Sequence, residues 1–282
     1  MVLQKLETEL RLRGFSEKTV KNYIFYNQKF LDFINKQPED IQEDDIKSFI
    51  AHLMSDKNYK PASTNLAICS LRYFYEKVLE KEIFTKITPP KSEKKIPTVL
   101  TKEELSQLFN AINNKKHRIL LELMYSSGLR VSEAVSLKFE DLNLNEKVGI
   151  VRQAKGRKDR IIILSNNTVD KLEKYKKKRD KKKLFPDNPY IFPSNKQKES
   201  HMSIRQAQKV INDAAKKAGI KKRVFCHSLR SSFATHLLDS GTDIRVIQEL
   251  LGHSNLSTTE RYTKVSTEQL KKVRSPFDNI KF

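Results

Sequence analysis

Residues 227–236 read His-Ser-Leu-Arg-Ser-Ser-Phe-Ala-Thr-His, and the run has the spacing of a helix with one polar face. Helical residues three apart share a face, so His227 and Arg230 lie together while Leu229 and Phe233 point elsewhere. Two interpretations are open at this point. The pair belongs to a functional site, or it is a histidine at the start of a helix beside a solvated arginine.

Four more groups of polar residues lie in the C-terminal part where an ordinary core would not need them. They are centred on Arg130, Lys155, His253 and Tyr262. Glu133 follows Arg130 at a helix–helix junction and would orient its guanidinium toward a phosphate. Lys155 lies in the turn of a hairpin, from which it can reach into a groove and donate a proton. His253 directly follows a helix-ending glycine, and a capping box places Tyr262 in the second turn of a short helix. Taken singly, Arg130 is better interpreted as part of a surface ion pair with Glu133, Lys155 as an ordinary basic turn residue, and Tyr262 as a half-buried packing residue.

The surrounding C-terminal part is mainly helical. Thr101 begins a capping box, and an apolar helix runs from about His117 to Gly128, where a left-handed cap ends it. Residues 148–152 and 160–164 are β-prone runs joined by a short polar link, which predicts a hairpin. The lysine-rich helix that follows is most simply a solvated face. Helices are expected over residues 167–183, 203–218, 227–240 and 243–251.

Residues 1 to about 85 predict a bundle of about four helices. Ser16 precedes an apolar-faced run that Pro38 ends, and Pro61 opens a later helix. Prolines and lysines between residues 88 and 97 predict a solvated boundary, because proline cannot continue a helix. The fold class is therefore mainly α with a small β-hairpin in the C-terminal domain. The predicted domains are residues 1–88, a linker at 89–99, and residues 100–282.

Basic residues outnumber acidic ones by a wide margin, with 55 Lys and Arg against 34 Asp and Glu, a net charge of +21. Residues 1–98 carry 17 basic and 14 acidic side chains, a net of +3, which leaves +18 for the rest. Such self-repulsion favours a nucleic-acid partner over a membrane-surface protein or a merely well-solvated protein. Two cysteines, no secretory leader and no apolar run of membrane length predict a reducing, intracellular setting.

Together the five groups resemble the tyrosine recombinase (phage integrase) family, and within it the Xer-like enzymes of bacteria and archaea. The resemblance covers essentially the whole chain, and five motifs in order with matching spacing are highly specific. The chain departs from the family pattern twice. Ser231-Ser232 stand where His-Thr is common, and Lys264 stands where a histidine is frequent. Neither departure removes a catalytic position, although both bear on the subfamily.

The resemblance implies a transesterification. Tyr262 attacks a DNA phosphodiester, a 5′-hydroxyl leaves, and a 3′-phosphotyrosine forms. Because one ester replaces another, no ATP is expected. No metal ion or other cofactor is expected either, because the guanidiniums of Arg130 and Arg230 can neutralise the phosphate. The implied roles are phosphate neutralisation by Arg130 and Arg230, hydrogen bonding or proton transfer by His227 and His253, and protonation of the leaving oxygen by Lys155.

The resemblance also implies partners. A SAM-like core-DNA-binding domain and the catalytic domain would form a C-shaped clamp on double-stranded DNA, in the cytoplasm with the nucleoid and away from membranes. The segment after Tyr262 predicts a short apolar-faced helix that a neighbouring protomer receives, in a tetramer on two DNA sites. An accessory recombinase or a DNA translocase is a further partner that the resemblance allows. The expected task is resolution of chromosome or plasmid dimers. A mobile-element integrase, a type IB topoisomerase-like enzyme and a non-catalytic DNA-binding protein are the alternatives.

Overall fold

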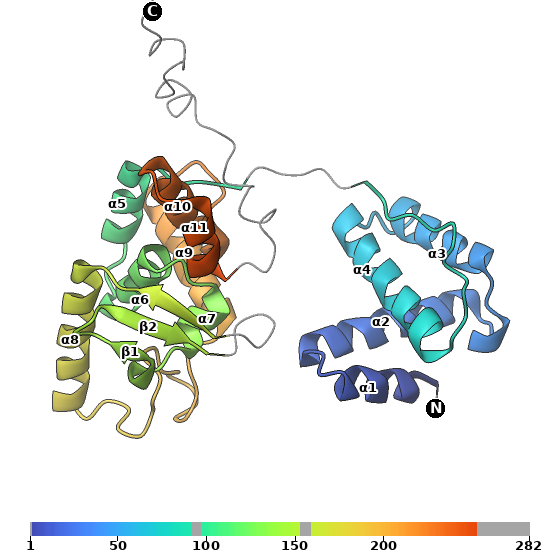
Figure 1. Cartoon of the computed structure of the whole chain (residues 1–282), viewed down its shortest axis with the longest axis horizontal. Coiled ribbons are helices and arrows are strands. Elements are labelled where there is room, and N and C mark those ends of the chain that lie inside the picture. The colour runs from blue at the N-terminus through green and yellow to red at the C-terminus, as the bar shows by residue number, and fades with distance from the viewer. Residues whose placement is uncertain (1, 92–96, 153–158, 253–282) are drawn as a thin grey trace, which may run out of the picture. The chain divides into compact units, whose positions relative to one another are not determined.

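The computed structural model describes residues 2–91, 97–152 and 159–252, and the chain divides into two compact units, Met1–Lys95 and Ile96–Phe282. Each unit has a hydrophobic core of its own. Figure 1 shows a helical N-terminal unit and a C-terminal unit that combines helices with one small sheet. The predicted fold class, mainly α with a small β element in the C-terminal domain, is confirmed.

The N-terminal unit is the expected bundle, and local sequence signals fix the ends of its helices. The Ser16 hydroxyl accepts a hydrogen bond from the amide of Thr19, which caps the second helix, and Pro61 occupies the first turn of a later one. Buried Asn27 joins two helices, since its Nδ2 lies 2.9 Å from Oγ of Ser70. The elements are α1 (Val2–Leu12), α2 (Glu17–Ile34), η1 (Pro38–Asp40), α3 (Glu43–Ser55), α4 (Pro61–Arg72) and η2 (Tyr73–Val78).

The C-terminal unit surrounds one apolar helix, α6, in which every residue from Ile119 to Met124 is buried. Helices α5, α8 and α10 all pack against it. The Thr101 capping box forms as expected, with its hydroxyl 3.2 Å from the Glu104 amide. The helices are α5 (Lys102–Asn110), α6 (Lys115–Ser126), α7 (Val131–Ser136), α8 (Asn166–Lys181), α9 (Ile204–Lys217), α10 (Cys226–Asp239) and α11 (Ile244–Leu251), with the short turn η3 (Phe139–Asp141).

The predicted hairpin forms the larger part of an antiparallel sheet of three strands in the order β1-β2-β3. The register pairs Val148 with Ile163 and Val151 with Arg160. The added strand β1 was not predicted, because two residues are too few to show an alternating pattern. The strands are β1 (Leu142–Asn143), β2 (Val148–Val151) and β3 (Arg160–Ile163).

The C-terminal ends of α6 and α11 lie close together in the C-terminal unit, because one side chain, Arg230, donates to the carbonyls of Gly128 and Leu251. Gly128 and Gly252 adopt left-handed backbone angles, both with φ of 60°, just after α6 and α11. A Cβ added to Gly128 would lie 2.5 Å from the ring of Phe233, so α6 must end in glycine where it meets α10. No helix in the described parts of the chain has the length and apolar character needed to cross a membrane.

Candidate active site

Arg130 is the N-cap of α7, and Glu133 orients it as predicted. The Arg130 amide donates to Oε2 of Glu133 at 2.8 Å, and its Nη1 donates to Oε1 at 2.7 Å. Its Nη2 lies 3.5 Å from the carbonyl oxygen of Gly252. Only 8% of Glu133 is exposed, so the carboxylate lies inside the protein. The interpretation of this pair as a solvated surface ion pair is therefore excluded.

Arg230 is the second guanidinium of the site, and it is one of the most deeply buried side chains in the unit at 1% exposure. Its Nη1 donates to the carbonyl of Gly128 at 2.6 Å, and its Nη2 donates to the carbonyl of Leu251. Its Nη1 also lies 3.9 Å from Oε2 of Glu133. The side chain thus joins α10 to the ends of α6 and α11, and it is not the solvated arginine of the simpler interpretation.

His227 lies in the first turn of α10, three residues before Arg230, and remains open to solvent. Partial burial, together with the positive charges of Arg230 and Arg130, lowers the pKa of His227 below its ordinary value of 6.5. The lowered pKa favours the neutral form of the imidazole near pH 7. It can donate one hydrogen bond and accept another.

Titration of His227 gives a prediction with a definite sign. We expect its NMR midpoint below 6.5, and Arg130→Gln should move that midpoint upward by removing a positive charge. As pH falls through the window below 6.5, the unfolded chain takes up this proton first, so acidification favours unfolding. A midpoint at or above 6.5 in the wild-type chain would contradict the arrangement.

Arg160 is a part of the site that the sequence reasoning missed. It opens β3, is 8% exposed, and donates from Nη2 to Oε2 of Glu133 at 2.8 Å. Its Nε donates to the carbonyl of Leu250 at 2.9 Å, and a Cβ added to Gly252 would lie 2.8 Å from its Cδ. One signal was available. A charged residue begins an otherwise apolar strand, at a position that alternation places on the buried face.

The cluster carries a net positive charge. Glu133 is the one carboxylate in contact with three guanidiniums, Arg130, Arg160 and Arg230, within the described residues. Burial alone would raise the pKa of Glu133, but the hydrogen bond and charge of Arg160, with the contacts from Arg130, outweigh it and lower that pKa. The carboxylate stays ionised, so three positive charges face one negative charge. An anion with two or more oxygens is the ligand that such a cluster favours.

Ser232, one of the residues that departs from the family pattern, has a structural place in this unit. Its hydroxyl accepts from the Leu100 amide at 2.9 Å and donates to the Ser228 carbonyl at 2.8 Å. The serine therefore ties the first residues of the C-terminal unit to α10.

The predicted site residues divide into two groups. Arg130, His227 and Arg230 are brought together with Glu133, whereas Lys155, His253 and Tyr262 lie outside the described residues. The predicted helix after Tyr262 lies outside them as well. Gly252, which directly precedes His253 in sequence, is in contact with both Arg130 and Arg160.

Two family models match the chain. Residues 98–269 match the Phage integrase family, and residues 2–85 match the Phage integrase N-terminal SAM-like domain. Tyrosine recombinase XerA of Pyrococcus horikoshii is 37% identical over 272 residues, which cover 96% of this chain and 91% of that protein. Tyrosine recombinase XerC of Staphylococcus epidermidis is 34% identical over 274 residues, which cover 93% of this chain and 91% of that protein.

Solved structures give the same result. A crystal structure of XerA recombinase is 34% identical, with a TM-score of 0.57, and the match covers 96% of this chain and 95% of that one. A structure of XerH site-specific recombinase bound to a palindromic difH substrate has a TM-score of 0.73 at 24% identity, over 95% of this chain and 82% of that one. The second likeness is one of fold.

Proposed function

Because this chain belongs to the phage integrase family, we propose that it is a site-specific tyrosine recombinase that cuts and rejoins double-stranded DNA. The observation that carries the proposal is the cluster of Arg130, Arg230 and Glu133 beside His227. Phosphoryl transfer depends on positioning and on neutralising the charge of the non-bridging oxygens. Two guanidiniums held in place by buried acceptors supply both.

Three further residues complete the proposed chemistry. The phenolic oxygen of Tyr262 attacks phosphorus as its proton passes to the imidazole of His227, the bond to the 5′-oxygen breaks, and a 3′-phosphotyrosyl ester forms while the 5′-oxygen takes up a proton. We assign that proton to Lys155, and a hydrogen bond to the phosphate to His253. A 5′-hydroxyl from a partner strand then attacks the ester, which restores the phenol and joins new ends. One ester replaces another at each step, so the reaction needs no ATP.

The role of Lys155 predicts rescue by a better leaving group. Lys155→Ala should slow cleavage of ordinary DNA by roughly 10²–10⁴-fold, the usual contribution of a general acid. A 5′-bridging sulfur leaves without protonation, so the same variant should cleave such DNA within about tenfold of wild type. Single-turnover cleavage of both substrates is the measurement, and His227→Gln, which should show no rescue, is the control. An equal defect on both substrates would exclude Lys155 as the acid.

We assign the predicted domains accordingly. Residues 1–88 form a SAM-like DNA-binding domain, 89–99 the linker, and 100–282 the catalytic domain. The likeness of residues 2–85 to the SAM-like family model and the net +18 beyond residue 98 support contacts by both domains with duplex DNA. The relatives named XerA and XerC support a task on chromosomal or plasmid dimers, in the cytoplasm with the nucleoid. An accessory recombinase or a translocase would be a partner in that task.

We further propose that four protomers assemble on two DNA sites through the segment after Tyr262. Removal of the residues after Ser266 should abolish recombination, while the affinity for a single DNA site changes by less than about threefold, because the phosphate contacts remain. Gel-shift titration and a two-site recombination assay measure the two effects. A truncated chain that recombines normally would refute the role of this segment.

Denaturing capture of covalent protein–DNA adducts from cells, followed by sequencing, tests the function itself. Cells that lack the protein are the control. Adducts at one or a few loci, with joining of two such sites by the purified protein, are the expected result. Adducts without sequence preference would replace the proposal with a topoisomerase activity. Absence of adducts, both in cells and on nicked DNA that traps the intermediate, would replace it with a binding function.

A further inference from the structure

The lysine run of α8 is divided between two different surfaces. Lys171, Lys174 and Lys178, with Tyr175 between them, line a cavity of about 950 Å³. Their spacing of three and four residues puts them on one face of the helix. The acidic residues of this helix lie elsewhere, because Asp170, Glu173 and Asp180 do not line that cavity. One face of α8 therefore carries lysines without acidic residues, whereas a helix that is solvated all round has no need of such a separation.

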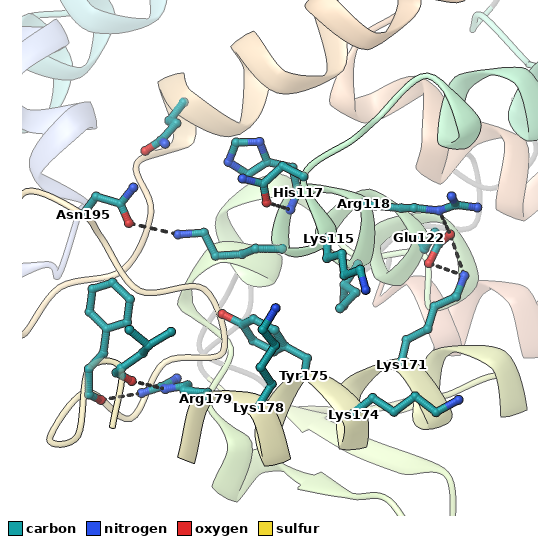
Figure 2. A pocket seen from close by; sticks show the side chains of 16 residues that line it. Lys115, His117, Arg118, Glu122, Lys171, Lys174, Tyr175, Lys178, Arg179 and Asn195 are labelled. Carbon is teal, nitrogen blue, oxygen red and sulfur yellow. Dashed lines mark hydrogen bonds and ion pairs between the residues drawn. The ribbon is translucent and has the colours of Figure 1, made fainter. Parts of the chain in front are cut away.

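The opposite wall of this cavity carries a second basic run, Lys115-Lys116-His117-Arg118, from the first turn of α6. Figure 2 shows side chains of α6 and α8 approaching one another across the cavity. The first turn of α6 contains no acidic residue to offset these cations. The positive end of the helix dipole makes this an unfavourable place for them. Helices α6 and α8 thus both place positively charged side chains around this cavity. We call this cavity the cationic pocket.

The cationic pocket is poorly neutralised. Glu122 is the one carboxylate among its lining residues, and it already binds Nε of Arg118 at 2.8 Å and Nζ of Lys171 at 2.7 Å. In the described part of the chain, Lys115, Lys174 and Lys178 have neither an ion-pair nor a side-chain hydrogen-bond partner.

Burial and neighbouring positive charge both act on two groups of the α6 wall. Burial, followed by the charge of Arg179, lowers the pKa of Lys116, and burial, followed by the charge of Lys116, lowers that of His117. Repulsion between cations has the same sign as the effect of burial, and a bound anion would oppose both.

The cationic pocket is separate from the proposed catalytic centre. It lies at the N-terminal end of α6, whereas Arg130 follows the C-terminal end of the same helix. The 12 residues of α6 rise about 18 Å along its axis. Arg130, His227 and Arg230 are not among the residues that line the pocket.

We propose that the cationic pocket is a second binding site for phosphate groups, occupied by a ligand that carries several of them. The walls supply what such a ligand needs, namely flexible ammonium groups from Lys115, Lys174 and Lys178 around a recess large enough for more than one phosphate. Two sources offer this chemistry. One is the backbone of the DNA on which the proposed function rests, and the other is a small polyphosphate.

Inorganic tripolyphosphate is the probe, measured by calorimetry on the full chain. The pocket variant is Lys174→Gln with Lys178→Gln, and the control is Lys177→Gln with Lys181→Gln, which removes equal charge from residues of α8 that do not line the pocket. All four lysines are exposed, so both variants should fold normally. We expect the pocket variant to bind tripolyphosphate at least about tenfold more weakly and the control to bind it as wild type does.

A salt titration of DNA binding distinguishes the two sources. If DNA occupies the pocket, the slope of log K against log salt falls by about 1.8 in the pocket variant, and DNA displaces tripolyphosphate. If a small polyphosphate occupies it, the slope matches that of the control variant and tripolyphosphate stays bound with DNA present. Equal tripolyphosphate binding by both variants, with equal slopes, would overturn the proposal. Cleavage of nicked DNA by the wild-type chain at low salt tests the proposed function separately, because none of these lysines is assigned a part in the bond-breaking step.

Discussion

A chain in which Tyr262 is replaced by phenylalanine is expected to form no covalent adduct with DNA. The substitution removes the one oxygen that the proposed reaction joins to phosphorus, and leaves the ring in place. Loss of a nucleophile lowers turnover by on the order of 10⁴-fold or more, because the remaining groups cannot supply the missing bond. The DNA phosphate contacts do not involve this oxygen, so affinity for DNA should stay within about threefold of wild type.

A nicked substrate that traps the covalent intermediate, run on a denaturing gel, measures this result. Tyr190→Phe is a matched control, because the hydroxyl of Tyr190 has no hydrogen-bond partner among the described residues. The control variant should form adduct at the wild-type rate. An adduct formed by the Tyr262→Phe chain would show that another residue is the nucleophile.

Glu133→Gln should cost the C-terminal unit about 3 kcal/mol of unfolding free energy, as expected when one partner of a buried ion pair is removed. The side chain keeps its shape but no longer offsets the charges of Arg130 and Arg160, both within 2.8 Å of its oxygens. For a unit of this size the melting temperature should fall by about 6–12 °C. Cleavage should fall as well, since Arg130 donates to both oxygens of Glu133 and glutamine offers only one accepting oxygen.

Thermal unfolding followed as a function of pH tests the electrostatic origin of this effect. The pKa of Glu133 is lowered in the folded chain, so its stabilisation is present above the ordinary value of 4.5 and is lost as pH falls through the lower folded value. The difference between wild type and variant should therefore shrink in acid. Glu140→Gln is the control, because that carboxylate is 65% exposed and its loss should change stability by less than about 1 kcal/mol. A Glu133→Gln chain that melts within about 1 °C of wild type would contradict the argument.

Helix ends were the part of the fold most accessible from sequence. Caps and left-handed glycines act within one helical turn, so the residues next to them in sequence are enough to predict them. This holds for the caps at Ser16 and Thr101 and for the glycines at 128 and 252. Strand β1 was missed because its pairing with β2 is settled by contacts rather than by its own two residues.

The site was partly accessible for the same reason. His227 and Arg230 share a helix, so their proximity follows from spacing alone, and Glu133 lies within a turn of Arg130. Arg160 reaches the cluster across 27 positions of sequence, and no local pattern records that contact. The depth of Arg230 was equally hidden, because burial depends on how α10 packs against other elements.

The acceptors of the Arg230 guanidinium are carbonyl groups of Gly128 and Leu251, and every amino acid offers a carbonyl. A library that randomises position 251 should therefore retain function in many members that fill the same apolar space. Position 128 should tolerate almost nothing, since a Cβ there meets the ring of Phe233 at 2.5 Å. The two positions that bind Arg230 through their carbonyl groups thus differ sharply in how many amino acids they can accept.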